Sequence, residues 1–223
     1  MSVHKAKARR RTTPAPPLAV VLARRELAAL ISLVLGHCGL ETLVANDVAD
    51  AQALVDTERA CLVILDAGHD AGRAALLELG GGRAYATLAL VELDRRESSF
   101  TAFTQGADDV VRVPFTPDEL AIRVAQVLRR IGQPTSFVRN ILRGGLELSL
   151  DEYVLVGSRM IPLGAAQNSL LYLLAANAER HVRRADIREL VWGIERSADD
   201  KGVDQAVGQL RRSLGGLPGG VTR

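Results

Sequence analysis

The 223-residue sequence contains only two cysteines, Cys38 and Cys61, and neither has a CxxC partner or the spacing of a metal ligand. Both lie in apolar segments, so we expect buried thiols in a reducing cytoplasm rather than a disulfide. The longest apolar runs, 18–23 and 170–176, are far shorter than the ~20 residues that cross a membrane. A nucleophile–base pair and a metal-ligand cluster are also lacking, which argues against an enzyme and against a cofactor.

The N-terminal stretch, residues 1–17, has no apolar segment that would make it a secretory signal. It does have five basic and no acidic residues, namely Lys5, Lys7, Arg9, Arg10 and Arg11. We expect a disordered basic arm here. An organelle transit peptide and a segment that adds nonspecific phosphate contacts are the alternatives.

Charge is distributed unevenly along the rest of the chain. Residues 14–131 hold 11 Lys and Arg against 16 Asp and Glu, whereas residues 132–223 hold 12 against 10. An acidic middle followed by a mildly basic end indicates two domains with different partners.

The first half alternates apolar runs of strand length with helical patterns. Strands are expected at 18–22, 40–45, 61–65, 86–91 and 109–113, and helices at 25–36, 48–57, 71–79, 97–105 and 116–131. This alternation predicts a doubly wound α/β domain with five parallel strands. In the last helix Thr116 is a candidate cap, Pro117 occupies the first turn, and Glu119 has capping-box spacing. Functional residues are expected at the carboxyl ends of the strands.

The second half has a different pattern. Residues 132–140, GQPTSFVRN, have the composition of a linker. Residues 141–163 alternate apolar and polar side chains between turn signals, which predicts a small antiparallel sheet. Three helical patterns follow at 165–177, 183–191 and 201–214. The last has one apolar face and one basic, amide-rich face.

Three stretches are similar to a known family: GADDVVRVPFTPDEL (106–120), ELVWG (189–193) and VDQAVGQLRRSLG (203–215). In this order, with a linker between them, they resemble the OmpR/PhoB family of response regulators over about residues 18–220. The resemblance implies a receiver-like domain at 18–131, a linker at 132–140 and an α+β winged helix-turn-helix domain at 141–223. Such a protein is a cytoplasmic transcription regulator of a two-component system.

The resemblance also implies a phosphoryl acceptor, and this position falls on Asp66, at the end of the third strand. The other phosphorylation positions are not kept. The family's acidic pair falls on Leu22 and Ala23, its Thr/Ser on Val91 and its Lys on Val113. Without them, Mg²⁺ lacks carboxylates and a phosphoryl group lacks hydrogen-bond donors. We therefore expect an atypical receiver in which Asp66 is an inactive acceptor.

Three interpretations of Asp66 remain. It is a strand-end carboxylate that is solvated or paired with Arg24 or Arg25, which would replace the charge of the missing metal. Alternatively, the pocket recognises a small metabolite. The third is conventional phosphorelay through Asp66 itself.

The family pairs two receivers through the surface of the fourth helix, fifth strand and fifth helix. Charged residues match that surface at Asp108, Asp109, Glu119 and Arg123, with Arg95 as a further contributor. We expect a constitutive homodimer on this face. The alternative is an ordinary solvated surface, since single exposed ion pairs contribute little.

In the effector half, the resemblance makes 201–214 the recognition helix, and Trp192 is expected to pack in the core. Phosphate contacts are expected from Lys201, Arg211 and Arg212, and base contacts from Gln205 and Gln209, which can hydrogen-bond adenine edges in the major groove of double-stranded DNA. A merely solvated polar face is the alternative. A protein-interaction module that contacts RNA polymerase or another regulator is a second candidate function.

The family also has a C-terminal β-hairpin, the wing. This sequence ends at GGVTR (219–223), where the first strand of that hairpin should begin. We expect the sequence to be truncated at this point, and a protein without a wing is the alternative.

Overall fold

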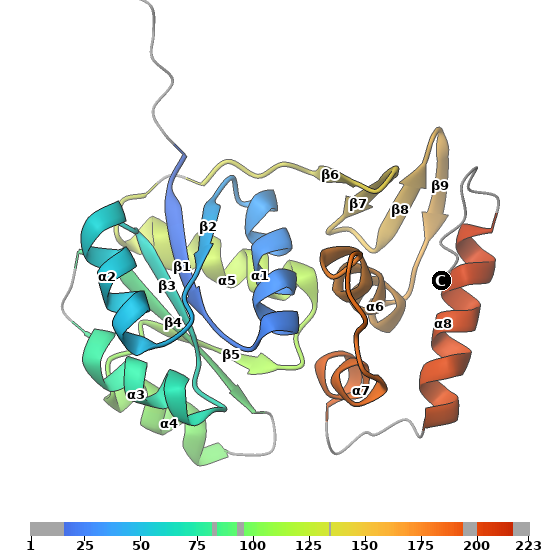
Figure 1. Ribbon diagram of the computed structural model, residues 1–223. Coiled ribbons are helices and arrows are strands. Elements are labelled where there is room, and N and C mark those ends of the chain that lie inside the picture. Colours follow the sequence, from blue (N-terminus) through green and yellow to red (C-terminus); the bar gives the residue numbers. More distant parts are fainter. Residues whose placement is uncertain (1–15, 82–83, 93–95, 134, 194–199, 216–223) are drawn as a thin grey trace, which may run out of the picture.

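The computed structural model describes residues 16–81, 84–92, 96–133, 135–193 and 200–215. The basic arm up to residue 15, Arg95 and the residues after 215 lie outside this part of the chain. Two sheets of different kind follow one another along the sequence, each covered by its own helices (Figure 1).

The first sheet has five parallel strands in the order β2-β1-β3-β4-β5. Its strands are β1 (Leu18–Leu22), β2 (Glu41–Val44), β3 (Leu62–Asp66), β4 (Ala86–Glu92) and β5 (Asp109–Val113). The helices between and after them are α1 (Arg25–His37), α2 (Val48–Glu58), α3 (Asp70–Leu79), α4 (Arg96–Thr104) and α5 (Pro117–Arg130). The predicted doubly wound α/β fold is confirmed.

Alternation along the strands explains the two layers of helices. In β1, Ala19 and Val21 face the core that α1 and α5 cover, whereas Val20 and Leu22 face the core under α2 and α3. Both faces are apolar because a parallel sheet of this kind is buried on both sides.

Helix α5 begins as predicted at Pro117, but the Thr116 side chain makes no capping hydrogen bond. The expected capping box is therefore wrong. Pro117 presets the helical φ angle and has no N–H to be capped, and Asp118 and Glu119 place negative charge at the helix N-terminus. The start of the helix is thus stabilised without the threonine hydroxyl.

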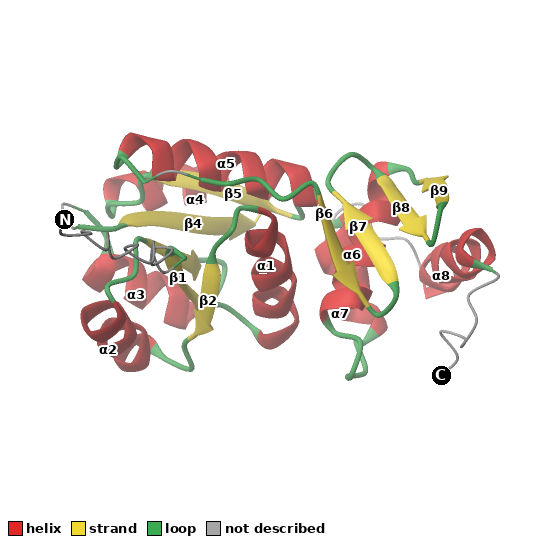
Figure 2. Ribbon diagram, turned by 90° about the horizontal axis from the view of Figure 1, so that it is seen from above, coloured by secondary structure: helices red, strands yellow, loops and turns green. Residues whose placement is uncertain are grey.

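The second sheet is antiparallel with the order β6-β7-β8-β9. Its strands are β6 (Asn140–Arg143), β7 (Leu146–Ser149), β8 (Tyr153–Val156) and β9 (Arg159–Pro162). Three helices follow, α6 (Ala165–Ala176), α7 (Arg184–Trp192) and α8 (Asp200–Leu214). This arrangement of one small sheet and three helices was predicted, and Figure 2 shows it from above.

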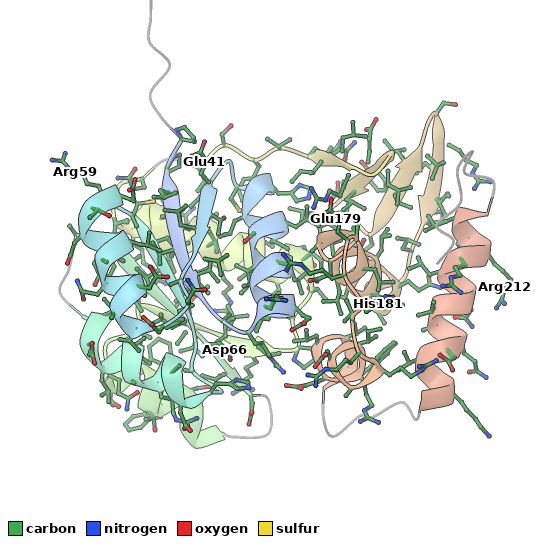
Figure 3. All side chains as sticks on the ribbon, viewed as in Figure 1. Glu41, Arg59, Asp66, Glu179, His181 and Arg212 are labelled. Atoms are coloured by element: carbon green, nitrogen blue, oxygen red, sulfur yellow. The ribbon has the colours of Figure 1, made fainter. Side chains whose placement is uncertain are left out.

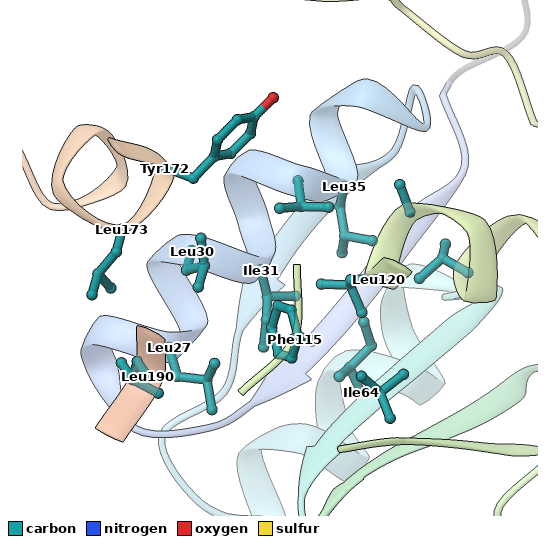
Figure 4. Close-up of a cluster of buried hydrophobic side chains, with 14 of the residues drawn as sticks. Leu27, Leu30, Ile31, Leu35, Ile64, Phe115, Leu120, Tyr172, Leu173 and Leu190 are labelled. Atoms are coloured by element: carbon teal, nitrogen blue, oxygen red, sulfur yellow. The ribbon is translucent and has the colours of Figure 1, made fainter. Parts of the chain in front are cut away.

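The two units pack against each other through α1 and α6. Helix α1 lies between the first sheet and α6, and side chains of both units form one continuous apolar cluster. Figure 4 shows this cluster, in which Leu30 of α1 lies toward Tyr172 and Leu173 of α6, and Ile31 lies beside Phe115. The first sheet and the helix-turn-helix helices are therefore held in a defined relation, which the sequence did not predict.

Among the helices of the described residues, none combines the length and the apolar character needed to cross a membrane.

Candidate functional site: the end of strand β3 and helix α8

Asp66 is the last residue of β3 and lies where the strands of the first sheet end (Figure 3). Its side chain is buried, with only 4% of the residue exposed. Three positions near it are apolar, and the residues there, Leu22, Val91 and Val113, are buried as well. These three side chains have no polar atoms with which to bind a phosphoryl group or a metal.

The guanidinium group of Arg24 lies beside the Asp66 carboxylate. Arg24 follows β1 directly, and its Nε lies 3.7 Å from Oδ2 of Asp66. Nδ1 of His69 lies 3.3 Å from the same oxygen. Neither contact counts as a hydrogen bond, so Asp66 Oδ2 and Arg24 Nε have no hydrogen-bond partner among the described residues. The interaction of Arg24 with Asp66 is therefore mainly electrostatic.

Arg24 also contacts the second unit. Its Nη2 donates a hydrogen bond to Oε1 of Glu189 on α7, at 2.5 Å. Burial by itself would lower the pKa of Arg24, but the hydrogen bond to Glu189 and the negative charges of Glu189, Asp66 and Asp186 outweigh it, so the pKa is raised above its usual value. The guanidinium is thus a fixed cation shared by two carboxylates on different units.

The C-terminal end of α7 reaches the same edge of the sheet. Gly193 follows α7 with φ +83°, and a Cβ at this position would lie 3.1 Å from Cδ of Pro114, the residue after β5. Trp192, one residue earlier, is partly buried against the core, as predicted. Helix α7 therefore contacts the loops after β1 and β5, on either side of Asp66.

These contacts bear on the Mg²⁺ that receivers of this kind use. In the described part of the chain, no group of three or more His, Cys, Asp or Glu side chains is arranged to hold a metal ion. Of the three family positions for acidic ligands only Asp66 is acidic, and Arg24 already places a positive charge beside it. The residues present do not fit Mg²⁺, which requires several oxygen ligands.

The residues predicted for a dimer interface lie around β5 and α5. Asp109 is buried, and both of its carboxylate oxygens lie within 3.4 Å of Nη1 of Arg123 in the same chain. Asp108 is exposed, but its Oδ2 accepts a hydrogen bond from the Thr87 backbone N–H. Glu119 is half-buried at the start of α5. Two of the predicted residues are therefore paired with each other within the chain.

Exposed apolar side chains lie on α5 and on the neighbouring helix α4. Phe100 and Phe103 on α4 are 74% and 49% exposed, and Ile122 on α5 is 51% exposed. Sequence reasoning emphasised the charged residues here and did not single out these three. Their exposure among polar neighbours is the signal that identifies them in the structure.

Helix α8 lies on the side of the second unit that faces away from the first sheet, as Figures 1 and 3 show. Its core side consists of Val203, Leu210 and Leu214, which are buried. The predicted DNA-contacting residues are all exposed, namely Lys201, Gln205, Gln209, Arg211 and Arg212. The structure therefore places all five on one solvent-facing helix. The major groove of DNA is wide enough to admit an α-helix.

A surface ion pair connects the two helices of the helix-turn-helix. Nη2 of Arg184 on α7 lies 3.0 Å from Oδ1 of Asp204 on α8, and both side chains are 60% exposed. Buried Leu190 and Val191 of α7 belong to the same apolar cluster as Val203 and Leu210 of α8. A displacement of α7 would therefore change the packing of α8.

A second polar contact between the units was also missed by sequence reasoning. His37, at the end of α1, is fully buried; its Nε2 lies 2.7 Å from the Tyr172 hydroxyl and its Nδ1 lies 2.7 Å from the Val138 carbonyl oxygen. Burial lowers the pKa of His37 and outweighs the opposite effect of the hydrogen bond to Val138. A neutral ring with Nδ1–H donating to Val138 and Nε2 accepting from Tyr172 satisfies both nitrogens.

Comparison with known proteins agrees with this two-part architecture. The family model described as "Transcriptional regulatory protein, C terminal" matches residues 158–220. Heme response regulator HssR of Staphylococcus epidermidis is 35% identical over 122 residues, which are 54% of this chain and 54% of that protein. The chain thus spans about half the length of HssR.

A longer match covers both units. Probable transcriptional regulator ycf27 of Porphyridium aerugineum is 30% identical over 203 residues, or 86% of this chain and 82% of that protein. Among solved structures, the response regulator DrrB, a Thermotoga maritima OmpR/PhoB homolog, matches with a TM-score of 0.42 and 25% identity, covering 91% of each chain.

A receiver fold joined to a helix-turn-helix domain with an N-terminal sheet defines a response-regulator architecture. The chain belongs to the OmpR/PhoB family of response regulators, and it is a DNA-binding transcription regulator of that family.

Proposed function

We propose that this regulator binds specific double-stranded DNA sites as a homodimer and that its receiver works without phosphorylation of Asp66. The observation that carries the proposal is the placement of Arg24 beside the buried Asp66 carboxylate, with apolar residues at Leu22, Val91 and Val113. The proposed domains are a basic arm (1–17), the receiver-like domain (18–131), a linker (132–140) and the DNA-binding domain (141–223).

Physical reasoning supports independence from phosphorylation. Transfer to Asp66 would replace its single negative charge by a doubly charged phosphoryl group in a buried site whose neighbours Val91 and Val113 donate no hydrogen bond. Arg24, which lies beside Asp66, is already engaged by Glu189. Mg²⁺ would meet the positive charge of the guanidinium instead of a set of carboxylates.

Recognition of DNA is proposed for the exposed side of α8. Lys201, Arg211 and Arg212 would neutralise phosphates, and Gln205 and Gln209 would hydrogen-bond adenine edges. All five are exposed on a helix that the core holds by its opposite side. The protein would act in the cytoplasm, without enzymatic activity, and contact with RNA polymerase would follow from DNA binding.

Dimerisation is proposed on the face formed by α4, β5 and α5. The exposed Phe100, Phe103 and Ile122 supply apolar area there, while Asp108, Glu119 and Arg123 add polar contacts at its border. Because the same patch of both subunits meets at a two-fold axis, the dimer would be symmetric and closed.

A titration of labelled genomic fragments tests the DNA-binding proposal. We expect sequence-selective binding that weakens steeply with salt, with the same affinity before and after treatment with acetyl phosphate and Mg²⁺. Arg212→Ala should lower affinity for all sequences and reduce the salt dependence by about one counterion. Gln209→Ala should instead relax the preference at one base position.

Glu179→Gln, in the exposed loop before α7, is the matched control and should leave binding unchanged. Binding that ignores sequence, or a wild-type affinity that rises markedly after acetyl phosphate treatment, would contradict the proposal. Sedimentation of the wild type and of Ile122→Glu tests the dimer. A charge at the centre of the proposed face should yield monomers, and an unchanged molecular mass would rule this face out.

A further inference from the structure

We propose that Arg24 couples the charge at Asp66 to helix α7 of the DNA-binding domain. The three residues Asp66, Arg24 and Glu189 are called the Arg24 bridge below. The inference rests on the proposed function in one respect only, that α7 and α8 form the DNA-binding unit.

The geometry of the bridge allows one side chain to sense both units. Arg24 offers Nε to Asp66 Oδ2 at 3.7 Å and Nη2 to Glu189 Oε1 at 2.5 Å. The two carboxylates therefore interact with different nitrogens of one planar guanidinium. A change that moves this group toward or away from Asp66 must also change its hydrogen bond to Glu189.

Burial makes the bridge sensitive to charge. The side chain of Asp66 is 6% exposed, and those of Arg24 and Glu189 are 22% and 27% exposed. Salt and water screen such groups less than they screen surface pairs. Loss of the Asp66 charge, as in Asp66→Asn, would remove the electrostatic attraction that positions Arg24.

The position of α7 determines what the bridge controls. Glu189 lies near the end of α7, four residues before Gly193, which packs against Pro114 after β5. Helix α7 in turn shares its core with α8 and is paired to it through Arg184 and Asp204. The bridge therefore joins the end of β3 to the helix that supports the DNA-contacting helix.

Helix α8 faces away from the first unit, as Figures 1 and 2 show. The bridge therefore restrains α8 through α7 and does not cover its polar face. The bridge would therefore affect the conformation of the DNA-binding domain without blocking its DNA-binding surface.

Amide hydrogen exchange of the full-length protein without DNA tests this coupling. The readout is the exchange of α7 amides relative to α2 amides in the same molecule. Arg24→Leu and Glu189→Gln should each accelerate exchange in α7 by about tenfold, the equivalent of one lost charge-assisted hydrogen bond. Asp66→Asn should accelerate it less, since it removes the positioning charge and keeps the hydrogen bond.

Arg25→Leu is the matched control, because Arg25 is the exposed neighbour at the start of α1. It should leave α7 exchange unchanged. In the Glu189→Gln background, Asp66→Asn should have no further effect, because the path to α7 is already broken. This non-additivity is the result that a purely local structural role of Asp66 would not produce.

Unchanged α7 exchange in Glu189→Gln, or an Asp66→Asn effect that is equal in both backgrounds, would overturn the inference. If Arg24→Leu accelerates amide exchange in α2 and α7 equally, the substitution has destabilised the whole fold. The exchange of α7 in Glu189→Gln, at a partly exposed residue, is then the test of the inference. The exchange experiment contains no DNA, so its result does not depend on DNA binding. A failure of DNA binding in the titration above would therefore contradict the proposed function but not the coupling through Arg24.

Discussion

The two ends of α1 hold the DNA-binding domain by different chemistry. At the N-terminal end, the charged Arg24 bridge joins the loop after β1 to α7. At the C-terminal end, a buried neutral histidine, His37, joins α1 to Val138 before the second sheet and to Tyr172 of α6. Between them, apolar residues of α1 pack on α6 (Figure 4).

This difference indicates a division of roles between the two ends. A charged group with a partly exposed partner responds to nearby charge, whereas a neutral pair in a dry site contributes rigid packing and responds to protons. Asp66, the carboxylate at the acceptor position of the receiver, is at the charged end. The His37 end lies far from the strand ends and is expected to be insensitive to what happens at Asp66.

The largest effect is expected from the His37 end. Tyr172 is fully buried, so Tyr172→Ala should lower the free energy of unfolding by about 3–5 kcal/mol through the cavity it leaves. Tyr172→Phe keeps the ring but leaves Nε2 of His37 without its donor, which should cost about 1–3 kcal/mol. Urea unfolding followed by circular dichroism measures both. Equal stabilities of the two variants would show that the ring contributes no packing here.

A smaller effect is expected at the charged end. Arg24→Leu should lower the free energy of unfolding by about 2 kcal/mol, because it leaves Asp66 buried without its cation. Adding Asp66→Leu should recover most of this loss, since the unpaired charge is then removed. The same urea titration compares the three proteins. A double variant that is less stable than Arg24→Leu would contradict the electrostatic account of this contact.

The two ends should also differ in their response to pH. Burial lowers the pKa of His37 below the ordinary 6.5, so the unfolded chain takes up this proton at a higher pH than the folded one. Stability from the His37 end is therefore present above the ordinary pKa and is lost as the pH falls below it toward the lowered folded value. His37→Gln should flatten this part of the urea midpoint's pH dependence, whereas Arg24→Leu should leave it in place.

The smallest effect is expected from the exposed pair between α7 and α8. Arg184 and Asp204 are both 60% exposed, so Arg184→Ala should change stability by no more than about 0.5 kcal/mol. Added salt should abolish even this difference. A loss as large as that of Arg24→Leu would show that burial does not distinguish the two ion pairs.

Sequence patterns were sufficient for the elements and insufficient for the contacts between units. The strands and helices lie within one or two residues of the predicted ranges, because period-2 and period-3.6 patterns are local signals. Pairing of Asp66 with Arg24 was among the alternatives, since both follow strand ends of one sheet. Glu189 could not be added, because it lies 165 residues from Arg24 and no local pattern connects them.

The same limit applies to His37 and Tyr172, which are 135 residues apart. A histidine within the apolar stretch LVLGHCGL (33–40) is an available signal of a buried polar group, but it does not identify the partner. The capping box at Thr116 failed for a different reason. Its spacing was correct, but spacing does not fix the direction of a hydroxyl when proline already begins the helix.

We infer that Arg24 stands beside Asp66 in place of a metal ion, so that the receiver does not work by phosphoryl transfer. Intact-mass measurement after incubation with acetyl phosphate and Mg²⁺ tests it most directly, with a receiver known to be phosphorylated under these conditions as the positive control. We expect no change in mass for this protein. A gain of one phosphoryl group that disappears in Asp66→Ala would contradict it.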